Sequence, residues 1–272
     1  MMRFAGRNVI VTGASAGIGA AAARRFAAEG ARVVLAARGR AGLDALAAEI
    51  TAAGGSALVV PTDVSDLRAA QALVEQTVAE LGGIDVLVNN AGANARGPID
   101  RYGADELARV VAVNLVAPIV LTRLALPHLR RSQAGAVVNV ASLAGRVPLV
   151  HEAVYSATKF GLRAFSFALA DELAEAGIKV AVVSPGPVDT GFIMDELDEV
   201  PDLVLSQPMA SPDAIAALIL DSASDGKGER VVRRLGGYLT TLGYLFPGLR
   251  RRLRPVMEAR GRKARERYRA GA

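Results

Sequence analysis

Short apolar runs alternate with longer alanine-rich helical patterns along most of this 272-residue chain. The runs, such as "VIV", "VVLAA", "VLV" and "VAVV", show almost no polar alternation. Strands of this composition are buried on both faces, as in a parallel sheet covered by helices. Strand–helix alternation also implies right-handed βαβ crossovers. We therefore predict an α/β fold with three layers, built on a doubly wound parallel sheet.

The pattern predicts seven strands and six helices. The expected strands are 8–12, 32–37, 56–61, 85–89, 136–141, 179–184 and 229–233. The expected helices are 17–29, 41–53, 66–81, 104–131, 153–176 and 211–222. The segment 186–210 is richer in Pro, Asp and Met and has no clear period, which favours a lid or substrate loop. We expect one catalytic domain over 1–233 and an extension over 234–272.

Composition excludes several kinds of site. The chain has no cysteine, which excludes disulfides and thiolate metal ligands and suits a reducing, cytoplasmic compartment. Its two histidines, His128 and His151, offer few imidazole ligands, so no metal site is expected. We also expect neither a signal peptide at the start nor a membrane-spanning helix, because no apolar run reaches about 18 residues.

A glycine-rich stretch, "VTGASAGIG", joins the first strand to the first helix. Gly13, Gly17 and Gly19 permit a tight turn, a close approach to a phosphate and close packing of helix on sheet. The helix start also offers free N–H groups and a positive dipole end to a pyrophosphate. The spacing differs from the generic G-x-G-x-x-G, but its position favours a nucleotide site over a plain turn. Ser15 and Ile18 are expected to line that site.

The end of the second strand bears on the choice of cofactor. An acidic residue there typically binds the ribose hydroxyls of NAD, whereas a nearby arginine suits the 2′-phosphate of NADP. In "LAARGR", Ala37 stands where the acid is expected, and Arg38 follows. A guanidinium can grip a phosphate with two hydrogen bonds. We therefore predict a preference for NADP(H) over NAD(H); the alternative is that Arg38 is only a solvated charge.

Several motifs occur together in one order along the chain. They are "TGASAGIG" (12–19), "DV" (63–64), "NNAG" (89–92), Asn114, Ser142, "YSATK" (155–159) and "PGPVDT" (185–190). This set resembles the short-chain dehydrogenase/reductase family, and the resemblance runs from about residue 5 to residue 233. It implies a single Rossmann-type domain with a seven-stranded parallel sheet. A homodimer or homotetramer is also expected.

The resemblance implies roles for individual residues. Asp63 would bind the adenine amino group, and Val64 would contribute its backbone N–H. Asn90, Ala91 and Gly92 would line the adenosine ribose. The nicotinamide end would be held by Pro185, Gly186, Val188 and Thr190. Asn114 would hold a water molecule in a proton relay that passes through Lys159.

The side chains themselves suggest carbonyl reduction. A carbonyl that accepts hydride needs an acid to protonate its oxygen, and Tyr155 can supply that proton. A free phenol has a pKa of about 10, and Lys159, one helical turn on, is placed to lower it. Lys159 can also donate to the nicotinamide ribose, so both residues belong to the cofactor site as well. Ser142, at a strand end, can orient the substrate oxygen.

The C-terminal extension departs from the family pattern. Residues 230–272 carry 13 Arg or Lys and two Asp or Glu, whereas the rest of the chain is mildly acidic. An apolar stretch at 238–249 directly precedes "RRRLR" at 250–254. This combination favours either peripheral membrane contact through 238–254 or packing on the body or a second subunit. It could also cover the active-site mouth and favour a hydrophobic substrate. No nucleic acid is expected as a partner.

These observations predict an oxidoreductase that transfers a hydride between NADP(H) and a carbonyl or secondary alcohol. The substrate would be selected by the segments 93–97, 144–152 and 186–210, which carry no chemical signature of their own. Two alternatives on the same fold are a non-enzymatic dinucleotide sensor and a membrane-recruited scaffold.

Overall fold

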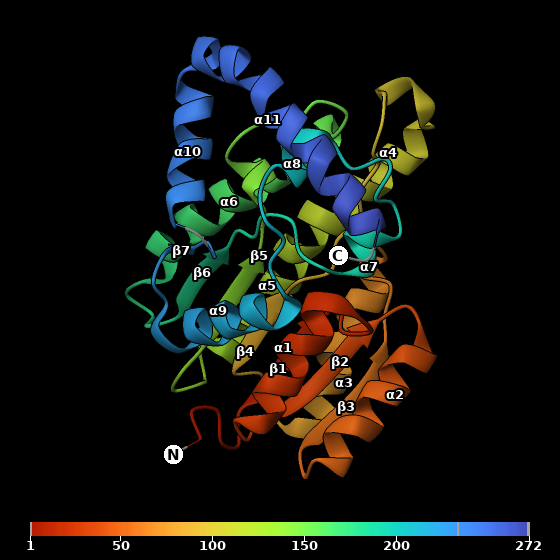
Figure 1. Cartoon of the computed structure of the whole chain (residues 1–272). Helices are drawn as coiled ribbons and strands as arrows, with labels where there is room; N and C mark the ends of the chain where they lie inside the picture. Colours follow the sequence, from red (N-terminus) through yellow and green to blue (C-terminus); the bar gives the residue numbers. More distant parts are fainter. Residues whose placement is uncertain (1, 233, 271–272) are drawn as a thin grey trace.

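The computed structural model of the protein describes residues 2–232 and 234–270 (Figure 1). Its centre is a seven-stranded parallel sheet in the order β3-β2-β1-β4-β5-β6-β7. The strands are β1 (Asn8–Thr12), β2 (Arg32–Ala37), β3 (Ser56–Pro61), β4 (Val86–Asn89), β5 (Ala136–Val140), β6 (Lys179–Val183) and β7 (Glu229–Arg230). The predicted doubly wound α/β fold is confirmed. The last residue of the expected strand 229–233 lies outside the described residues.

Helices cover both faces of the sheet. One face carries α1 (Gly17–Ala28), α2 (Arg40–Ala52) and α9 (Pro212–Asp225). The other carries α3 (Leu67–Leu81), α5 (Ala117–Leu129) and α6 (Ala153–Leu173). The short helices are η1 (Ile99–Arg101), α4 (Ala104–Val111), η3 (Leu143–Gly145), α7 (Gly191–Met194) and α8 (Asp202–Leu205).

The apolar strands are explained by burial on both faces. In β1, Val9 and Val11 pack into the core beneath α1 and α9, whereas Ile10 packs into the core beneath α3 and α5. All three side chains are completely buried. Successive strand residues point to opposite faces, so a strand between two helical layers must be apolar at every position. This is why the strands read as continuous apolar runs.

The expected helix 104–131 differs in one detail. A π-helical turn (η2, Ala112–Val116) separates α4 from α5. The wide turn carries Asn114, whose buried side chain bonds the backbone of Ala93. π-Bulges are frequent at functional sites. The stretch Ala104–Leu129 is long and apolar enough to cross a membrane by composition alone, but here one of its sides packs into the core beneath the sheet.

The segment 186–210 and the extension lie together above one end of the sheet. Within 186–210, α7 and α8 form single turns, and a bridge pairs Val188 with Ala210. The extension forms α10 (Arg234–Leu245) and α11 (Pro247–Arg269). Figure 1 shows α10 rising beside α6 and α11 running back across α8. The end of the extension, 271–272, lies outside the described residues.

Candidate active site

A cavity of about 1160 Å³ opens above the carboxyl ends of the central strands. Its walls include Gly13 after β1, Asn90 after β4, Ser142 after β5 and Pro185 after β6. In the strand order, β1 lies between β2 and β4, so the chain changes direction across the sheet at this point. Open α/β sheets bind ligands at such a switch point. The fold therefore brings the predicted motifs together although they are far apart in the sequence.

The glycine loop forms one wall of this cavity. Gly13 and Gly17 have φ values of +66° and +54°, which favour glycine. A Cβ atom on Gly13 would lie 2.9 Å from the Cα of Ala91. No side chain among the described residues caps α1 at Ala16, and its first turn has no acidic residue. The start of α1 therefore keeps N–H donors for an anion, and the loop fits a pyrophosphate.

Gly19 has a different position from the other two glycines. It is buried and does not line the cavity. A Cβ atom there would lie 2.2 Å from the carbonyl oxygen of Gly13. Any larger residue would push α1 away from β1. Gly19 thus serves the close packing of helix on sheet that the motif predicts, rather than contact with a ligand.

The remaining predicted adenosine-side residues also border the cavity. They are Ser15, Ile18, Arg38, Asp63, Val64, Ala91 and Gly92. The Asp63 carboxylate accepts hydrogen bonds from Ser65 and pairs with Arg109 at 2.7 Å. These contacts, with the bonds from Ser65 the strongest, hold the pKa of Asp63 below its usual value. Arg38 is exposed at the end of β2, so its guanidinium is available to a phosphate.

Asn90 joins two loops of the site. Its side-chain amide donates to the carbonyl oxygen of Thr12 at 2.9 Å, and its backbone N–H donates to the Thr12 hydroxyl at 3.0 Å. The amide therefore ties the end of β4 to the end of β1. This contact fixes the floor beneath the predicted adenosine ribose.

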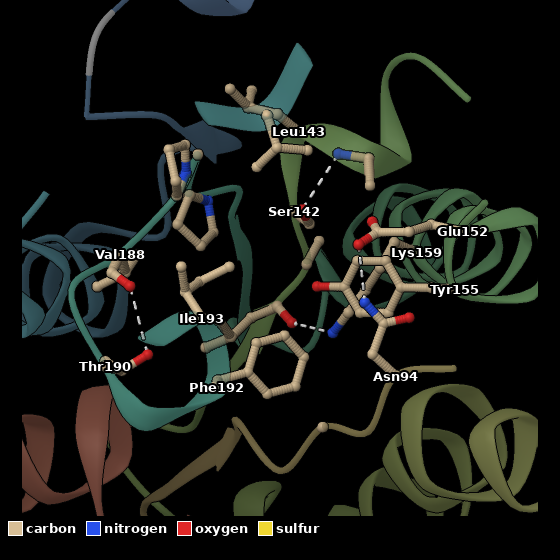
Figure 2. A pocket seen from close by; sticks show the side chains of 18 of the residues that line it. Asn94, Ser142, Leu143, Glu152, Tyr155, Lys159, Val188, Thr190, Phe192 and Ile193 are labelled. Carbon is tan, nitrogen blue, oxygen red and sulfur yellow. Dashed lines mark hydrogen bonds between the residues drawn. The ribbon is translucent and has the colours of Figure 1, made fainter. Parts of the chain in front are cut away.

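Ser142, Tyr155 and Lys159 meet inside the cavity (Figure 2). Ser142 follows β5, and its hydroxyl accepts a hydrogen bond from the N–H of Ala144 at 3.1 Å. Tyr155 and Lys159 come from the first turns of α6 and are 9% and 4% exposed. The Lys159 Nζ donates to the carbonyl oxygen of Val140 at 2.9 Å and lies 5.6 Å from the centre of the Tyr155 ring.

The pKa of Tyr155 moves in the opposite direction to the predicted one. Burial, together with the negative charge of Glu152, raises it to about 12, and the nearby Ser142 hydroxyl opposes this rise only in part. Burial lowers the pKa of Lys159 to about 8. The contacts of Lys159 explain the difference, because its ammonium is directed to Val140. Burial and the surrounding protein charges therefore keep Tyr155 as the neutral phenol.

Asn114 lies behind the cavity wall rather than in it. Its side chain is fully buried. The amide donates to the carbonyl oxygen of Ala93 at 2.8 Å and to the Thr158 hydroxyl at 3.1 Å, and its oxygen accepts from the N–H of Ala93. Asn114 thus holds the 93–97 loop against α6 in a fixed position next to Lys159.

The predicted nicotinamide end lies opposite Tyr155. Pro185, Gly186, Val188 and Thr190 all line the cavity. Thr190 follows the bridge at Val188, and its methyl group would be 3.1 Å from a Cβ atom on Gly17. Phe192 comes next, with its ring 6.2 Å from that of Tyr155. Figure 2 shows Val188, Thr190 and Phe192 facing Tyr155 and Lys159 across the cavity.

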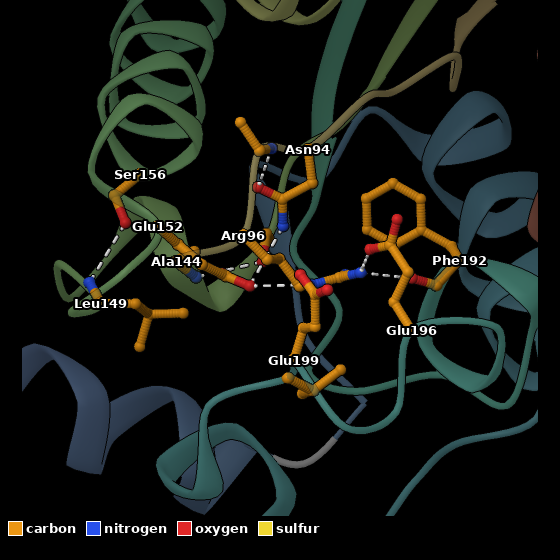
Figure 3. Close-up of polar contacts among 12 residues, drawn as sticks. Asn94, Arg96, Ala144, Leu149, Glu152, Ser156, Phe192, Glu196 and Glu199 are labelled. Carbon is orange, nitrogen blue, oxygen red and sulfur yellow. Dashed lines mark hydrogen bonds and ion pairs between the residues drawn. The ribbon is translucent and has the colours of Figure 1, made fainter. Parts of the chain in front are cut away.

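A buried ion network next to Tyr155 was not predicted from the sequence (Figure 3). Arg96 and Glu152 pair at 3.1 Å, and their side chains are only 2% and 4% exposed. Asn94 donates to the same carboxylate. Arg96 also pairs with Glu196, donates to the carbonyl oxygen of Phe192 and lies over its ring. The network therefore joins all three segments that were expected to select the substrate.

The C-terminal extension contributes to the same cavity. Leu242, Leu249, Leu253 and Met257 of α10 and α11 line it. α11 rests on α8, where Arg265 pairs with Asp202 at 2.7 Å. These elements line the cavity mainly with apolar side chains, although Thr240, Arg250 and Arg260 line it as well. Composition suggested a cover over the active-site mouth, but no local pattern indicated that α11 would dock on α8.

Within the described ranges, no group of three or more Asp, Glu or His residues is arranged to hold a metal ion. His151 lies outside the cavity lining, with an exposed side chain and a φ of +65°. Its carbonyl oxygen accepts a hydrogen bond from Gly97.

Comparison with known proteins agrees with this geometry. The family model described as short chain dehydrogenase matches residues 7–200. A ketoacyl reductase, HetN, from Nostoc is 37% identical over 227 residues, covering 83% of this chain and 79% of its own. The 3beta-hydroxysteroid dehydrogenase 1 of Eggerthella lenta is 40% identical, covering 68% of this chain and 72% of its own.

A solved structure is similar as well. It is a metagenomic short-chain oxidoreductase in complex with NADP, 36% identical, with a TM-score of 0.73 over 85% of this chain and 98% of its own. The chain therefore belongs to the short-chain dehydrogenase/reductase family of oxidoreductases, which use nicotinamide cofactors.

Proposed function

We propose that the protein reduces a carbonyl compound to a secondary alcohol with NADPH, and that it can catalyse the reverse reaction. The observation that carries this proposal is the meeting of Ser142, Tyr155 and Lys159 in one cavity with the glycine loop. When bound, NADP(H) supplies or accepts the hydride. Two of the relatives, a ketoacyl reductase and a hydroxysteroid dehydrogenase, are named for reactions on such groups, which supports the reaction class.

The side chains divide the work of the reaction. Tyr155 donates a proton to the substrate oxygen, and a pKa of about 12 keeps that proton in place at neutral pH. Ser142 donates a hydrogen bond to the same oxygen and orients it. Lys159, with a pKa lowered to about 8, can take up and release a proton near neutrality and so resupply Tyr155. Asn114 holds the loop next to Lys159. We include in the proposal that Asn114 takes part in returning the proton to Tyr155.

The preference for NADP(H) rests on the end of β2. Ala37 leaves no carboxylate at the ribose position, and the exposed Arg38 borders the cavity. Arg109 pairs with Asp63 close by and so offsets the one carboxylate on this side of the cavity. A 2′-phosphate would be attracted here, whereas a site with an acid at residue 37 would repel it.

The lining of the cavity favours a hydrophobic substrate. Much of its lining is apolar, including Leu143, Val147, Leu149 and Phe192, along with the leucine and methionine side chains of α10 and α11; Arg250 and Arg260 also line it. A homodimer or homotetramer in the cytoplasm is part of the proposal. In support, exposed apolar residues on α5 and α6, such as Ile119 and Phe167, could serve a subunit contact.

The proposal is tested by incubating the purified protein with NADPH or NADH and a panel of aliphatic, cyclic and β-keto carbonyl compounds. We expect NADPH oxidation with at least one hydrophobic member of the panel, and slower oxidation of NADH. Tight NADPH binding with no turnover on any member would instead favour the dinucleotide sensor.

A further inference from the structure

Exposed apolar side chains are concentrated on α10 and α11. Of the 18 large apolar side chains that are strongly exposed among the described residues, nine lie between 238 and 257. Soluble monomers rarely expose so many together unless the surface binds something. We call seven of them the apolar ridge, which consists of Tyr238, Leu242, Leu245, Phe246, Leu249, Leu253 and Val256.

The apolar ridge is flanked by positive charge. Arg250, Arg251, Arg252 and Arg254 follow the bend between the two helices. Within the described residues, only Arg254 of these four has an acidic partner, Glu258. Figure 1 shows the bend at the extremity of the molecule, far from α2 and α3. Apolar side chains beside unpaired arginines at a protruding bend are what binding to an anionic lipid surface requires.

The C-terminal part of α11 uses its charges differently, to fix the ridge to the body. Arg265 pairs with Asp202, and Arg269 pairs with Asp198. Gly261 fits directly on α8, where a Cβ atom would lie 1.8 Å from the carbonyl oxygen of Asp202. On α10, Tyr244 packs against Phe160 of α6 at 5.4 Å. The helices are therefore docked on the body, and the apolar ridge is preformed.

The cavity reaches the apolar ridge. Leu242, Leu249 and Leu253 are 45–50% exposed to solvent and also line the cavity that holds Tyr155. The exposed apolar surface of these three leucines therefore borders the same space as the catalytic groups. A lipophilic molecule on the ridge would meet apolar surface along its path into the cavity.

We propose that the apolar ridge docks on an anionic membrane surface and that lipophilic carbonyl substrates enter the cavity from the lipid. A second copy is a less suitable occupant, because a two-fold contact through the ridge would bring the two arginine clusters together. The docking half of the proposal stands alone. The delivery half rests on the proposed carbonyl reduction.

Vesicle co-sedimentation of the full chain tests the docking half. We expect binding to vesicles of phosphatidylcholine with phosphatidylserine, and much weaker binding to phosphatidylcholine alone or in high salt. The double variant Phe246→Gln/Arg251→Gln should reduce binding by about tenfold or more; neither residue lines the cavity. The matched control Leu67→Gln/Arg68→Gln changes the same kinds of exposed residue on α3 and should bind like the wild type.

Equal sedimentation of wild type and ridge variant would overturn the docking. A second outcome would also overturn it: the wild type does not bind vesicles, and the ridge variant loses self-association in light scattering. The ridge would then be a subunit contact.

Activity measurements separate delivery from the basic reaction. With a water-soluble ketone from the panel, the ridge variant should retain wild-type turnover. With a long-chain ketone dissolved in the vesicles, its turnover should fall in proportion to the lost binding. Unchanged turnover of the vesicle-dissolved ketone despite lost binding would refute delivery. Absence of turnover on every carbonyl would refute the proposed function and delivery together, while sedimentation would still decide docking.

Discussion

Replacing Arg96 with methionine removes the partner of a deeply buried carboxylate. Glu152 would keep only the amide of Asn94, 3.1 Å away, as a side-chain donor. Removing one partner of a buried ion pair costs about 3–5 kcal/mol of folding stability, because the other charge stays buried without a counter-charge. We expect the free energy of unfolding at pH 8 to fall by about that amount. Arg96 also holds Phe192 and Glu196, so the segment 186–210 should loosen at the same time.

The loss of stability caused by Arg96→Met should depend on pH in a defined direction. Burial raises the pKa of Glu152 above its ordinary value of 4.5, and Arg96 opposes that rise. Without Arg96 the pKa in the folded state rises further. An acid with a raised pKa in the folded state contributes stability below its unfolded pKa, and this is lost as the pH rises through the folded value. The destabilisation of Arg96→Met should therefore be smaller at pH 5 than at pH 8.

Urea unfolding of a double-mutant cycle measures this coupling. Arg96→Met, Glu152→Gln and the double variant are compared with the wild type at both pH values, and the coupling energy should be about 2 kcal/mol or more. The matched control is Arg101→Met, which breaks an exposed pair with Glu199 and should cost far less stability than Arg96→Met. A coupling energy within error of zero, or a loss equal to that of Arg101→Met, would show that Arg96 does not stabilise the buried Glu152 carboxylate.

Three further predictions concern the cofactor, the extension and Lys159. Arg38→Glu should lower the preference for NADPH over NADH by about tenfold or more, measured as the ratio of kcat/KM values; an unchanged ratio would contradict the role of Arg38. Gly261→Val should detach α11 from Asp202 and expose 234–272 to limited proteolysis, whereas Gly248→Ala, which has open space around it, should not. Because burial lowers the pKa of Lys159 from 10.5 to about 8, the wild type should gain stability relative to Lys159→Met as the pH rises from 8 towards 10.5; parallel pH profiles would contradict that pKa.

Much of the fold and of the site could be predicted from the sequence, because local pattern determines it. Strands buried between two helical layers must be apolar throughout, as Val9, Ile10 and Val11 are. Strand order then brings the carboxyl ends of β1, β4, β5 and β6 to one edge. Side chains that follow those strands meet in one cavity, whatever their distance along the chain.

Properties that depend on burial or on distant partners could not be predicted. The spacing of Tyr155 and Lys159 suggested a lowered phenol pKa, but desolvation and the charge of Glu152 outweigh the ammonium, which is directed to Val140. The pair of Arg96 with Glu152 joins residues 56 positions apart, and nothing in either local sequence indicates it. The docking of α11 on α8 depends on a fit at Gly261 that is equally nonlocal.

The most direct test of the account is single-turnover reduction by Tyr155→Phe with NADPH bound. The substitution removes only the phenolic hydroxyl, so NADPH affinity should stay within a few fold of wild type. The rate of NADPH oxidation in the presence of a reducible carbonyl should fall by about 10²–10⁴-fold, the usual contribution of a general acid. Wild-type turnover by Tyr155→Phe would contradict the assignment of Tyr155 as the proton donor.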